Sequence, residues 1–328
     1  MLSIISTGTA YPETVLTNKI LCDLSDSPVA AQNCPIETRR SSLPLRYLNI
    51  TKNNDHRLAA MVATKSPTQL GVEAVSLAIQ RAGITINDIG IAFGDTATSL
   101  QTTPSEAQRV VGLLGAKIPC YDVIGLSAFF PLQFETLLRW KKEKIPDYVL
   151  LFSTNTPTMF IKYGEGFEQL YFGDCAAAVI VSPSKEGQYK VLSADYHVAA
   201  KYNGCFSIPT SSHLKVNTSE LIINSDQKLA DVLHSIKEYK NAAKINWLVS
   251  DHISPETAKA LCLEYMPKAG FFSAVPNFGN TIGSAAILGL EQLSSLTEPG
   301  DLLALLSSGP DLSFGSIVLE KNLLCCTY

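Results

Sequence analysis

A single serine stands where an apolar strand pattern changes into an apolar helix pattern. Cys120–Ile124 has the composition of a short strand, and apolar positions from Phe130 onward recur at helical spacing. Ser127 lies between them, so its N–H falls at a helix N-terminus, where amides lack helical partners and negative charge is favoured. Such a turn can present a nucleophilic hydroxyl beside amides that stabilise an oxyanion. An ordinary N-cap has the same local pattern.

Three further polar segments fall where a strand ends or a helix begins. They are Asp251-His252, Gly279-Asn280-Thr281 and Gly309-Pro310-Asp311. Sites in open α/β sheets form at such strand ends. A histidine can transfer a proton and a carboxamide can donate hydrogen bonds, so the set suits a reaction in which negative charge develops on oxygen.

Strand and helix patterns alternate along the chain and place these segments. Strands are expected at 2–6, 88–93, 120–124, 148–153, 172–181, 246–250, 301–307 and 315–319. Helices are expected at 70–82, 103–112, 130–140, 227–240, 255–265 and 283–293. Segments 23–57 and 183–225 look polar and irregular. The alternation predicts an α/β fold with helices covering the sheets, and similar segments at 146–153 and 299–307 suggest an internal duplication.

Composition and charge limit the class of protein. The chain has 328 residues, of which 46% are hydrophobic and 17% charged, enough for one large fold or two fused halves. A net charge of −4 gives no basic footprint, so we expect no nucleic-acid partner. The eight cysteines lack zinc-site spacing, so we expect no metal and free thiols in a reducing cytosol. Neither a signal peptide nor a membrane-length apolar run is visible, which predicts a cytoplasmic protein without a membrane partner.

Five segments, in the same order, resemble the β-ketoacyl-ACP synthase III branch (initiating ketosynthases) of the thiolase superfamily over nearly the whole chain. The family's motifs "FD-x-x-x-A-C-S-G-F", "FGDGA", "WLVPH", "GNT" and a Gly-rich loop correspond to Tyr121–Phe130, Phe172–Ala176, Trp247–His252 (with one residue inserted), Gly279–Thr281 and Gly309–Asp311. The resemblance implies a thiolase fold of two similar βα halves in five layers, α/β/α/β/α. Residues 1–182 would form the half with the nucleophile, and 183–328 the half with the histidine and asparagine. It also implies a homodimer.

The resemblance implies a chemistry for the same residues. The nucleophile takes an acyl group from a CoA or carrier-protein thioester. His252 and Asn280 then donate hydrogen bonds to a malonyl-type thioester, which loses carbon dioxide and condenses with the acyl group in fatty acid or polyketide biosynthesis. Amides of Ser127 and of the loop from Gly309 to Asp311 would form an oxyanion hole. No cofactor is permanently bound, because acyl-CoA or a phosphopantetheine-linked acyl carrier protein is the substrate.

Basic residues of the N-terminal polar segment lie where the family surrounds the CoA nucleotide or phosphopantetheine. They are Arg39, Arg40 and Arg46. Ordinary solvated charges on a loop are the alternative interpretation of these arginines.

Two positions depart from the family pattern. Ser127 stands where the family has cysteine, and a hydroxyl is far less acidic than a thiol, so Ser127 needs His252 as a true general base. Asp311 stands where the family usually has glycine. A carboxylate there opposes an oxyanion, unless it faces away or orients His252.

Several interpretations of Ser127 stay open. It is a working nucleophile, or it marks a non-acylating subunit paired with an active ketosynthase, or it is an engineered replacement of cysteine in an ordinary ketosynthase III. Within the enzyme interpretations, acyl transfer to a hydroxyl or amine acceptor competes with condensation. The presence of both His252 and Asn280 favours condensation, because simple transfer does not need both.

Overall fold

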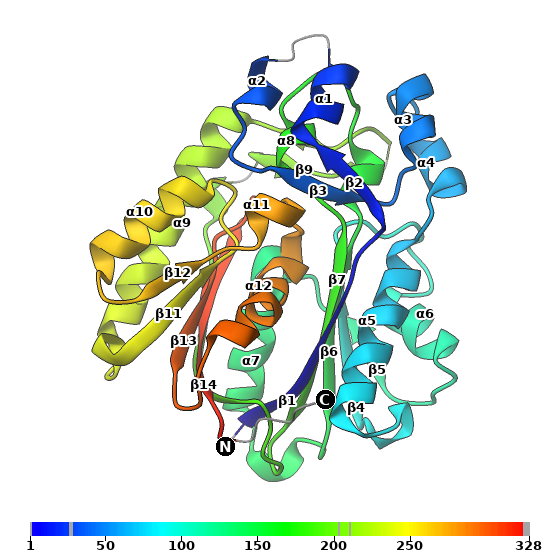
Figure 1. Ribbon diagram of the computed structural model, residues 1–328. Coiled ribbons are helices and arrows are strands. Elements are labelled where there is room, and N and C mark those ends of the chain that lie inside the picture. The colour runs from blue at the N-terminus through cyan, green and yellow to red at the C-terminus, as the bar shows by residue number, and fades with distance from the viewer. Residues whose placement is uncertain (1, 26–28, 203, 210, 324–328) are drawn as a thin grey trace.

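The computed structural model describes residues 2–25, 29–202, 204–209 and 211–323. Its centre is a ten-stranded mixed sheet with the order β12-β11-β13-β14-β8-β1-β7-β6-β4-β5 (Figure 1). The strands are β1 Leu2–Ala10, β4 Ile91–Asp95, β5 Cys120–Asp122, β6 Val149–Asn155, β7 Cys175–Ser182, β8 Tyr189–Val198, β11 Ile245–Ser250, β12 Gly270–Phe272, β13 Leu302–Ser307 and β14 Ser313–Lys321.

The two halves of the sheet repeat the same pattern of strand directions, read outward from the β1–β8 pair at its middle. On one side β4 lies parallel to β5 and β6, and β7 runs antiparallel to β6 and β1. On the other side β11 lies parallel to β12 and β13, and β14 runs antiparallel to β13 and β8. The two sets join through the antiparallel pair β1–β8. The boundary predicted at residue 182 falls between β7 and β8 and stays a prediction.

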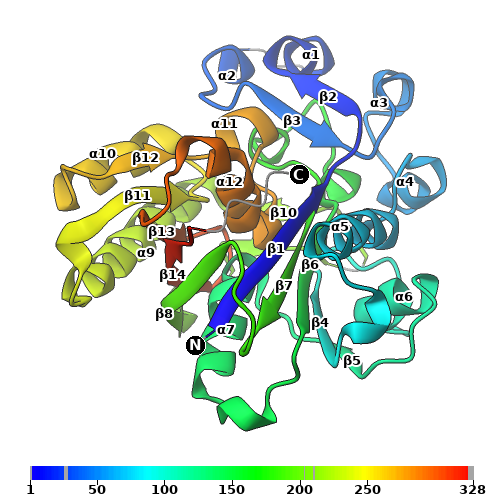
Figure 2. The same ribbon diagram turned by 60° about the horizontal axis from the view of Figure 1, so that its bottom comes forward.

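Helices form three layers around the two parts of the sheet. α5 (Pro67–Ala82) and α6 (Glu106–Leu113) pack outside the first part, and α9 (Thr218–Glu238) and α10 (Pro255–Tyr265) outside the second. α7 (Phe129–Arg139) and α12 (Ala285–Leu293) lie between the parts (Figures 1 and 2). This is the predicted five-layer arrangement, and the thiolase-like α/β fold is confirmed.

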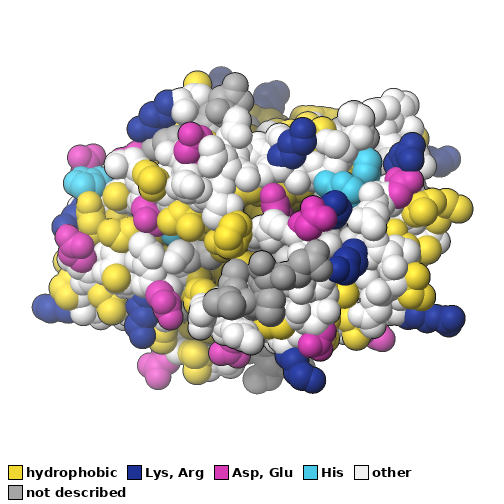
Figure 3. Space-filling model, turned by 90° about the horizontal axis from the view of Figure 1, so that it is seen from above, with side chains coloured by type: hydrophobic (Ala, Val, Ile, Leu, Met, Phe, Trp, Pro, Cys, Tyr) yellow, Lys and Arg dark blue, Asp and Glu magenta, His cyan; other side chains and the backbone are white. Residues whose placement is uncertain are grey.

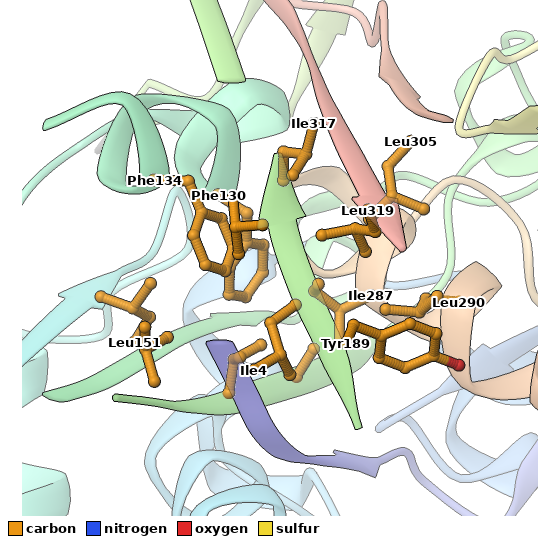
Figure 4. Close-up of a cluster of buried hydrophobic side chains, with 14 of the residues drawn as sticks. Ile4, Phe130, Phe134, Leu151, Tyr189, Ile287, Leu290, Leu305, Ile317 and Leu319 are labelled. Carbon is orange, nitrogen blue, oxygen red and sulfur yellow. The ribbon is translucent and has the colours of Figure 1, made fainter. Parts of the chain in front are cut away.

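The largest hydrophobic cluster fills the central layer. α7 contributes Phe130 and Phe134 to it, and α12 contributes Ile287 and Leu290, beside strand residues such as Ile4 (Figure 4). All of these side chains are buried. Burial of each large apolar side chain stabilises the fold by roughly 1.5–3 kcal/mol. The core therefore holds the N-terminal ends of α7 and α12 against each other.

Local signals account for α5, which begins three residues before its predicted start and ends where predicted. The Ser66 side chain and Gln69 form a capping box at the start of α5, and Pro67 occupies its first position. Gly83 ends the helix in the left-handed conformation, with φ of 66°. A Cβ at Gly8 would lie 2.3 Å from the Ala74 carbonyl oxygen, so glycine lets β1 approach α5.

The segments expected to be irregular contain regular structure. β8, near the middle of the sheet, lies within 183–225, where polar residues mask the strand pattern, and α9 begins nine residues before its predicted start. The segment 23–57 holds part of a small unit above the sheet (Figure 1). The remaining elements are β2 Thr14–Thr17, α1 Asn18–Leu24, α2 Val29–Gln32, β3 Thr38–Ser41, α3 Leu45–Thr51, α4 His56–Val62, α8 Glu168–Tyr171, β9 Phe206–Ser207, β10 Lys215–Val216 and α11 Val275–Phe278. Within the described ranges, no helix has both the length and the apolar character needed to cross a bilayer.

Candidate active site

The turn at residues 125–128, which we call the elbow, is held by a buried aspartate. Asp95, at the end of β4, accepts hydrogen bonds of 3.0 Å from the amides of Gly125 and Leu126 and one of 2.8 Å from the Ser153 hydroxyl. Leu126 has φ of 49°, a conformation that is strained for a residue with a side chain. Ser127 follows it in a short 3₁₀ turn, Leu126–Ala128, that leads into α7, and it is only 1% exposed. The strained turn between a strand and a helix has the form that a nucleophile elbow requires, and the role of Ser127 as a nucleophile stays a prediction.

A similar turn precedes α12 and contacts the elbow. Ile282 also has a positive φ, of 55°, and its amide donates to Asn280 Oδ1 at 2.9 Å. The Asn280 Nδ2 group donates to the Asp251 carbonyl at 2.7 Å. A Cβ at Gly283 would lie 2.7 Å from the Leu126 carbonyl oxygen, so the two turns touch. Asn280 therefore connects the end of β11 with the elbow.

Gly309 brings the third predicted segment to the same point. A Cβ at this glycine would lie 2.0 Å from Ser127 Oγ and 3.9 Å from Asn280 Nδ2. The amide of the preceding Ser308 donates to Asp251 Oδ1 at 2.8 Å. Ser127 Oγ is buried and has no hydrogen-bond partner among the described residues. The tertiary structure thus gathers Ser127, Asn280 and the end of β11 around one glycine.

His252 is buried, and acidic and backbone groups face its two ring nitrogens. Nδ1 lies 3.0 Å from both the amide nitrogen and the carbonyl oxygen of Ser254. Nε2 lies 3.1 Å from Asp226 Oδ1, at an angle that does not make a hydrogen bond. A carboxylate beside Nε2 favours the tautomer with its proton there, in which Nδ1 accepts from the Ser254 amide. No hydrogen bond joins His252 to Ser127 within the described part of the chain.

Asp311 already occupies the amide that the sequence assigns to an oxyanion hole. The Ser127 amide donates to Asp311 Oδ2 at 2.9 Å, while Oδ1 accepts from the amide of Ser313 at 2.6 Å and from its hydroxyl. The carboxylate therefore does not face away, and its partner is the Ser127 backbone rather than His252.

Three side chains at this site were missed in the sequence: Asp95, Asp226 and Lys228. Lys228 is 1% exposed and donates to the carbonyl oxygens of Gly309 and Asp311. It lies on the apolar face of α9, beside buried Leu229 and Val232. A lysine among the apolar residues of one helix face is the sequence signal that could have identified Lys228, because a buried lysine needs partners. Asp95 carries a similar signal, a carboxylate ending a buried strand.

Burial dominates the electrostatics of the acidic groups here. Removal from water raises the pKa of Asp95 and that of Asp251 to about 7, although hydrogen bonds partly oppose the shift. Burial likewise lowers the pKa of Lys228, against the attraction of Asp311 and Asp251. Within the described residues, no group of three or more potential metal ligands is arranged to hold an ion.

Asp95→Asn should weaken the pH dependence of stability. The folded-state pKa of Asp95, about 7, lies above its ordinary 3.8. As pH rises through this window the unfolded chain releases the proton first, so the stabilisation present below pH ~4 is lost by pH ~7. Asparagine keeps an oxygen for the elbow amides and does not titrate. We expect the thermal midpoint to fall less between pH 5 and pH 8 in the variant than in the parent.

Asp88→Asn is the control, at a surface residue whose pKa is lowered. Its thermal midpoint should fall as much over this pH range as that of the parent. An equal fall in Asp95→Asn would contradict the assignment of the raised pKa to Asp95.

The predicted CoA-contacting arginines have different surroundings. Arg39 is fully buried, and its Nε donates to the Leu170 carbonyl at 3.0 Å. Those contacts make it part of the fold, so we no longer include it among the candidates for CoA binding. Arg40 is partly buried over the ring of Tyr11, 4.9 Å from the centroid, and Arg46 is exposed on α3.

Two adjoining hollows open beside the elbow. One, of about 460 Å³, is lined by residues that include Leu126, Phe206 and Asp311. The second, of about 860 Å³, continues past Ile124 and Phe160. On the face seen from above in Figure 3, basic and acidic side chains are interspersed.

Comparison with known proteins agrees with this geometry. No family model matches the chain. It is 24% identical to β-ketoacyl-ACP synthase III of Chlamydia caviae over 97% of this chain and 96% of that one, and 24% identical to the enzyme of Shigella dysenteriae over 97% and 98%. The structure of 3-oxoacyl-ACP synthase III from Aquifex aeolicus superposes with a TM-score of 0.81, at 19% identity and covering 98% of this chain and all of that one. The fold is that of the ketosynthase III enzymes.

The priming ketosynthase of the R1128 polyketide pathway is similar too, with a TM-score of 0.80 at 18% identity, covering 98% of this chain and 97% of that one. Full-length similarity to these condensing enzymes indicates an acyltransferase-type enzyme.

Proposed function

We propose that this chain is a ketosynthase III-like enzyme that accepts an acyl group from a CoA or carrier-protein thioester on Ser127. It then condenses that group with a malonyl-type thioester. The observation that carries the proposal is the buried, unpartnered Ser127 Oγ on a left-handed turn, packed against Gly309 and beside Asn280. Other buried hydroxyls, including those of Ser307 and Ser308, also lack a partner among the described residues; what distinguishes Ser127 Oγ is its position on the strained elbow beside Asn280.

Acylation forms the Oγ–carbon bond and breaks the thioester's carbon–sulfur bond. His252 takes the Ser127 proton and returns it to the leaving thiolate, because a hydroxyl is not ionised at neutral pH. This requires Nε2 to turn from Asp226 towards the serine, in the tautomer whose Nδ1–H donates to the Ser254 carbonyl.

Condensation uses the second pair of donors. Asn280 Nδ2 carries two hydrogens, and only one is needed for the Asp251 carbonyl, so the other can meet a thioester oxygen. With His252 it stabilises the enolate formed when the malonyl group loses carbon dioxide. The enolate attacks the Ser127 ester, the oxygen–acyl bond breaks, and the serine oxygen takes up a proton from solvent, relayed through His252.

A structure of related fold supports an acyl thioester as the substrate. A cysteine-to-serine variant of OleA from Xanthomonas campestris, 18% identical with a TM-score of 0.77 and covering 97% of this chain and 98% of that one, was solved with lauric acid and lauroyl-CoA bound. A second candidate function is a non-acylating subunit of an active ketosynthase. The contact that favours it is the Asp311 carboxylate on the Ser127 amide.

Intact-mass measurement after incubation with acyl-CoA thioesters from acetyl to lauroyl tests the proposal. We expect an acyl adduct on the parent chain, mapped to Ser127 and absent in Ser127→Ala. With malonyl-CoA added, carbon dioxide release should fall about 10²–10³-fold in Asn280→Ala, the typical loss on removal of one oxyanion donor. Equal release in that variant would remove Asn280 from the mechanism, and the absence of any adduct across the donor panel would favour the subunit interpretation.

A further inference from the structure

The loop at residues 309–311 contacts the elbow through a carboxylate, and this contact bears directly on acylation. When a nucleophile adds to a thioester, the carbonyl oxygen becomes an oxyanion, and backbone amides at the elbow are the donors that stabilise it. Here the Ser127 amide donates 2.9 Å to Asp311 Oδ2. An amide N–H has one hydrogen, so it serves Asp311 or the oxyanion and not both.

A buried cation determines where that loop lies. Lys228 reaches from α9 to the carbonyl oxygens of Gly309 and of Asp311, the second at 2.6 Å. Two carbonyls bound to one ammonium fix the backbone on both sides of Pro310. With that backbone fixed, Oδ1 of Asp311 is also tied to Ser313, and Oδ2 is directed at Ser127.

The surrounding charges explain why lysine is suited to this position. Asp311 interacts electrostatically with the buried carboxylates of Asp95 and Asp251, which repel it when ionised. Lys228 attracts Asp311 and Asp251 together and is itself buried. An ammonium with three donors can bind both carbonyls while its positive charge offsets the repulsion among the carboxylates.

We propose that Lys228 is a positioning residue that keeps the Asp311 carboxylate on the Ser127 amide, so that acylation of Ser127 is limited by release of this contact. The inference rests on the proposed function, since it concerns acylation at the same serine. It also gives one explanation for the two positions, Ser127 and Asp311, at which the chain departs from the ketosynthase III pattern. The elbow retains the geometry of an oxyanion site, and the chain's own carboxylate fills it.

Hydrogen–deuterium exchange of the segment 125–129 tests the contact without relying on catalysis. Lys228→Met removes the ammonium and keeps an unbranched stem, Asp311→Asn keeps the side-chain shape and an acceptor oxygen, and Asp311→Gly removes the side chain. We expect the Ser127 amide to exchange at least about tenfold faster in Lys228→Met and Asp311→Gly, with a smaller increase in Asp311→Asn. Lys228→Arg should restore slow exchange, because its guanidinium can still donate to both carbonyls.

The acylation rate tests the consequence. With p-nitrophenyl butyrate and butyryl-CoA as probes, we expect Asp311→Gly to acylate Ser127 about 10- to 100-fold faster than the parent, approaching the effect of one oxyanion donor. Lys228→Met should increase the rate in the same direction, and Ser127→Ala should remove the adduct. Thermal unfolding confirms that each variant compared is folded.

The outcomes separate the two proposals. Unchanged exchange in a folded Lys228→Met variant overturns the role of Lys228, and unchanged or slower acylation in Asp311→Gly overturns the effect of the contact. If faster exchange is seen but neither the parent nor any variant forms an adduct, the proposed function fails, and with it the claim that this contact limits acylation. Faster exchange together with faster acylation supports both.

Discussion

Ser127→Cys should acylate on the order of a hundredfold faster than the parent chain. A free thiol with a pKa near 8.5 is about 3% thiolate at pH 7, whereas a hydroxyl remains protonated. The elbow already places this side chain at the start of α7, buried against Gly309. The rate is measured by intact mass with butyryl-CoA under single-turnover conditions.

The native cysteines require a control for this measurement. Cys120 lies on β5, the strand that precedes the elbow. Burial raises the pKa of its thiol, which makes it less reactive. Adding Cys120→Ser to the Ser127→Cys variant should leave the adduct unchanged. An adduct that disappears with Cys120, or a Ser127→Cys rate equal to that of the parent, would contradict the placement of the nucleophile at position 127.

Gly309→Ala should abolish most acylation, by about a hundredfold or more. The added Cβ would lie 2.0 Å from Ser127 Oγ and 2.6 Å from its Cβ, closer than non-bonded atoms approach, so Ser127 or the loop must move. A displacement of about 1 Å in a reacting group can cost on the order of 10²-fold in rate. Overpacking should also destabilise the fold by about 1–3 kcal/mol. Acylation kinetics and urea unfolding measure the two effects.

Gly112→Ala is the matched control for this substitution. Gly112 lies within α6, and an added Cβ meets nothing within 4 Å. Alanine should therefore stabilise the helix by about 0.5–1 kcal/mol and leave acylation unchanged. If Gly309→Ala retained both full acylation and the stability of the parent, the loop could not lie against Ser127 as the structure shows.

The sequence predicted those features whose signals are local. The bounds of α10 and the strand-to-helix change at Ser127 are visible in spacing and residue type, because the residues involved lie within a few turns of one another. The positions of His252 and Asn280 at element ends were also visible. The position of Asn280 beside Gly309 and Ser127 was expected from the resemblance to a family rather than from the pattern itself.

β8 could not be predicted in this way. Its alternating polar residues resemble a surface segment, and its place near the middle of the sheet depends on pairing with β14 and β1, which are distant in the chain. The burial of Arg39 could not be predicted either, because the carbonyl group that it binds belongs to Leu170, 131 residues away in the chain.

The chain by itself therefore determined an elbow with a serine, together with a histidine and an asparagine at the ends of elements, because each depends on short-range geometry. Only the tertiary structure decided what faces that serine. The Ser127 amide meets a carboxylate 184 residues away, and a lysine on another helix holds that carboxylate's loop. No local pattern specifies which buried charge meets which backbone amide, because that choice is made only when the layers pack.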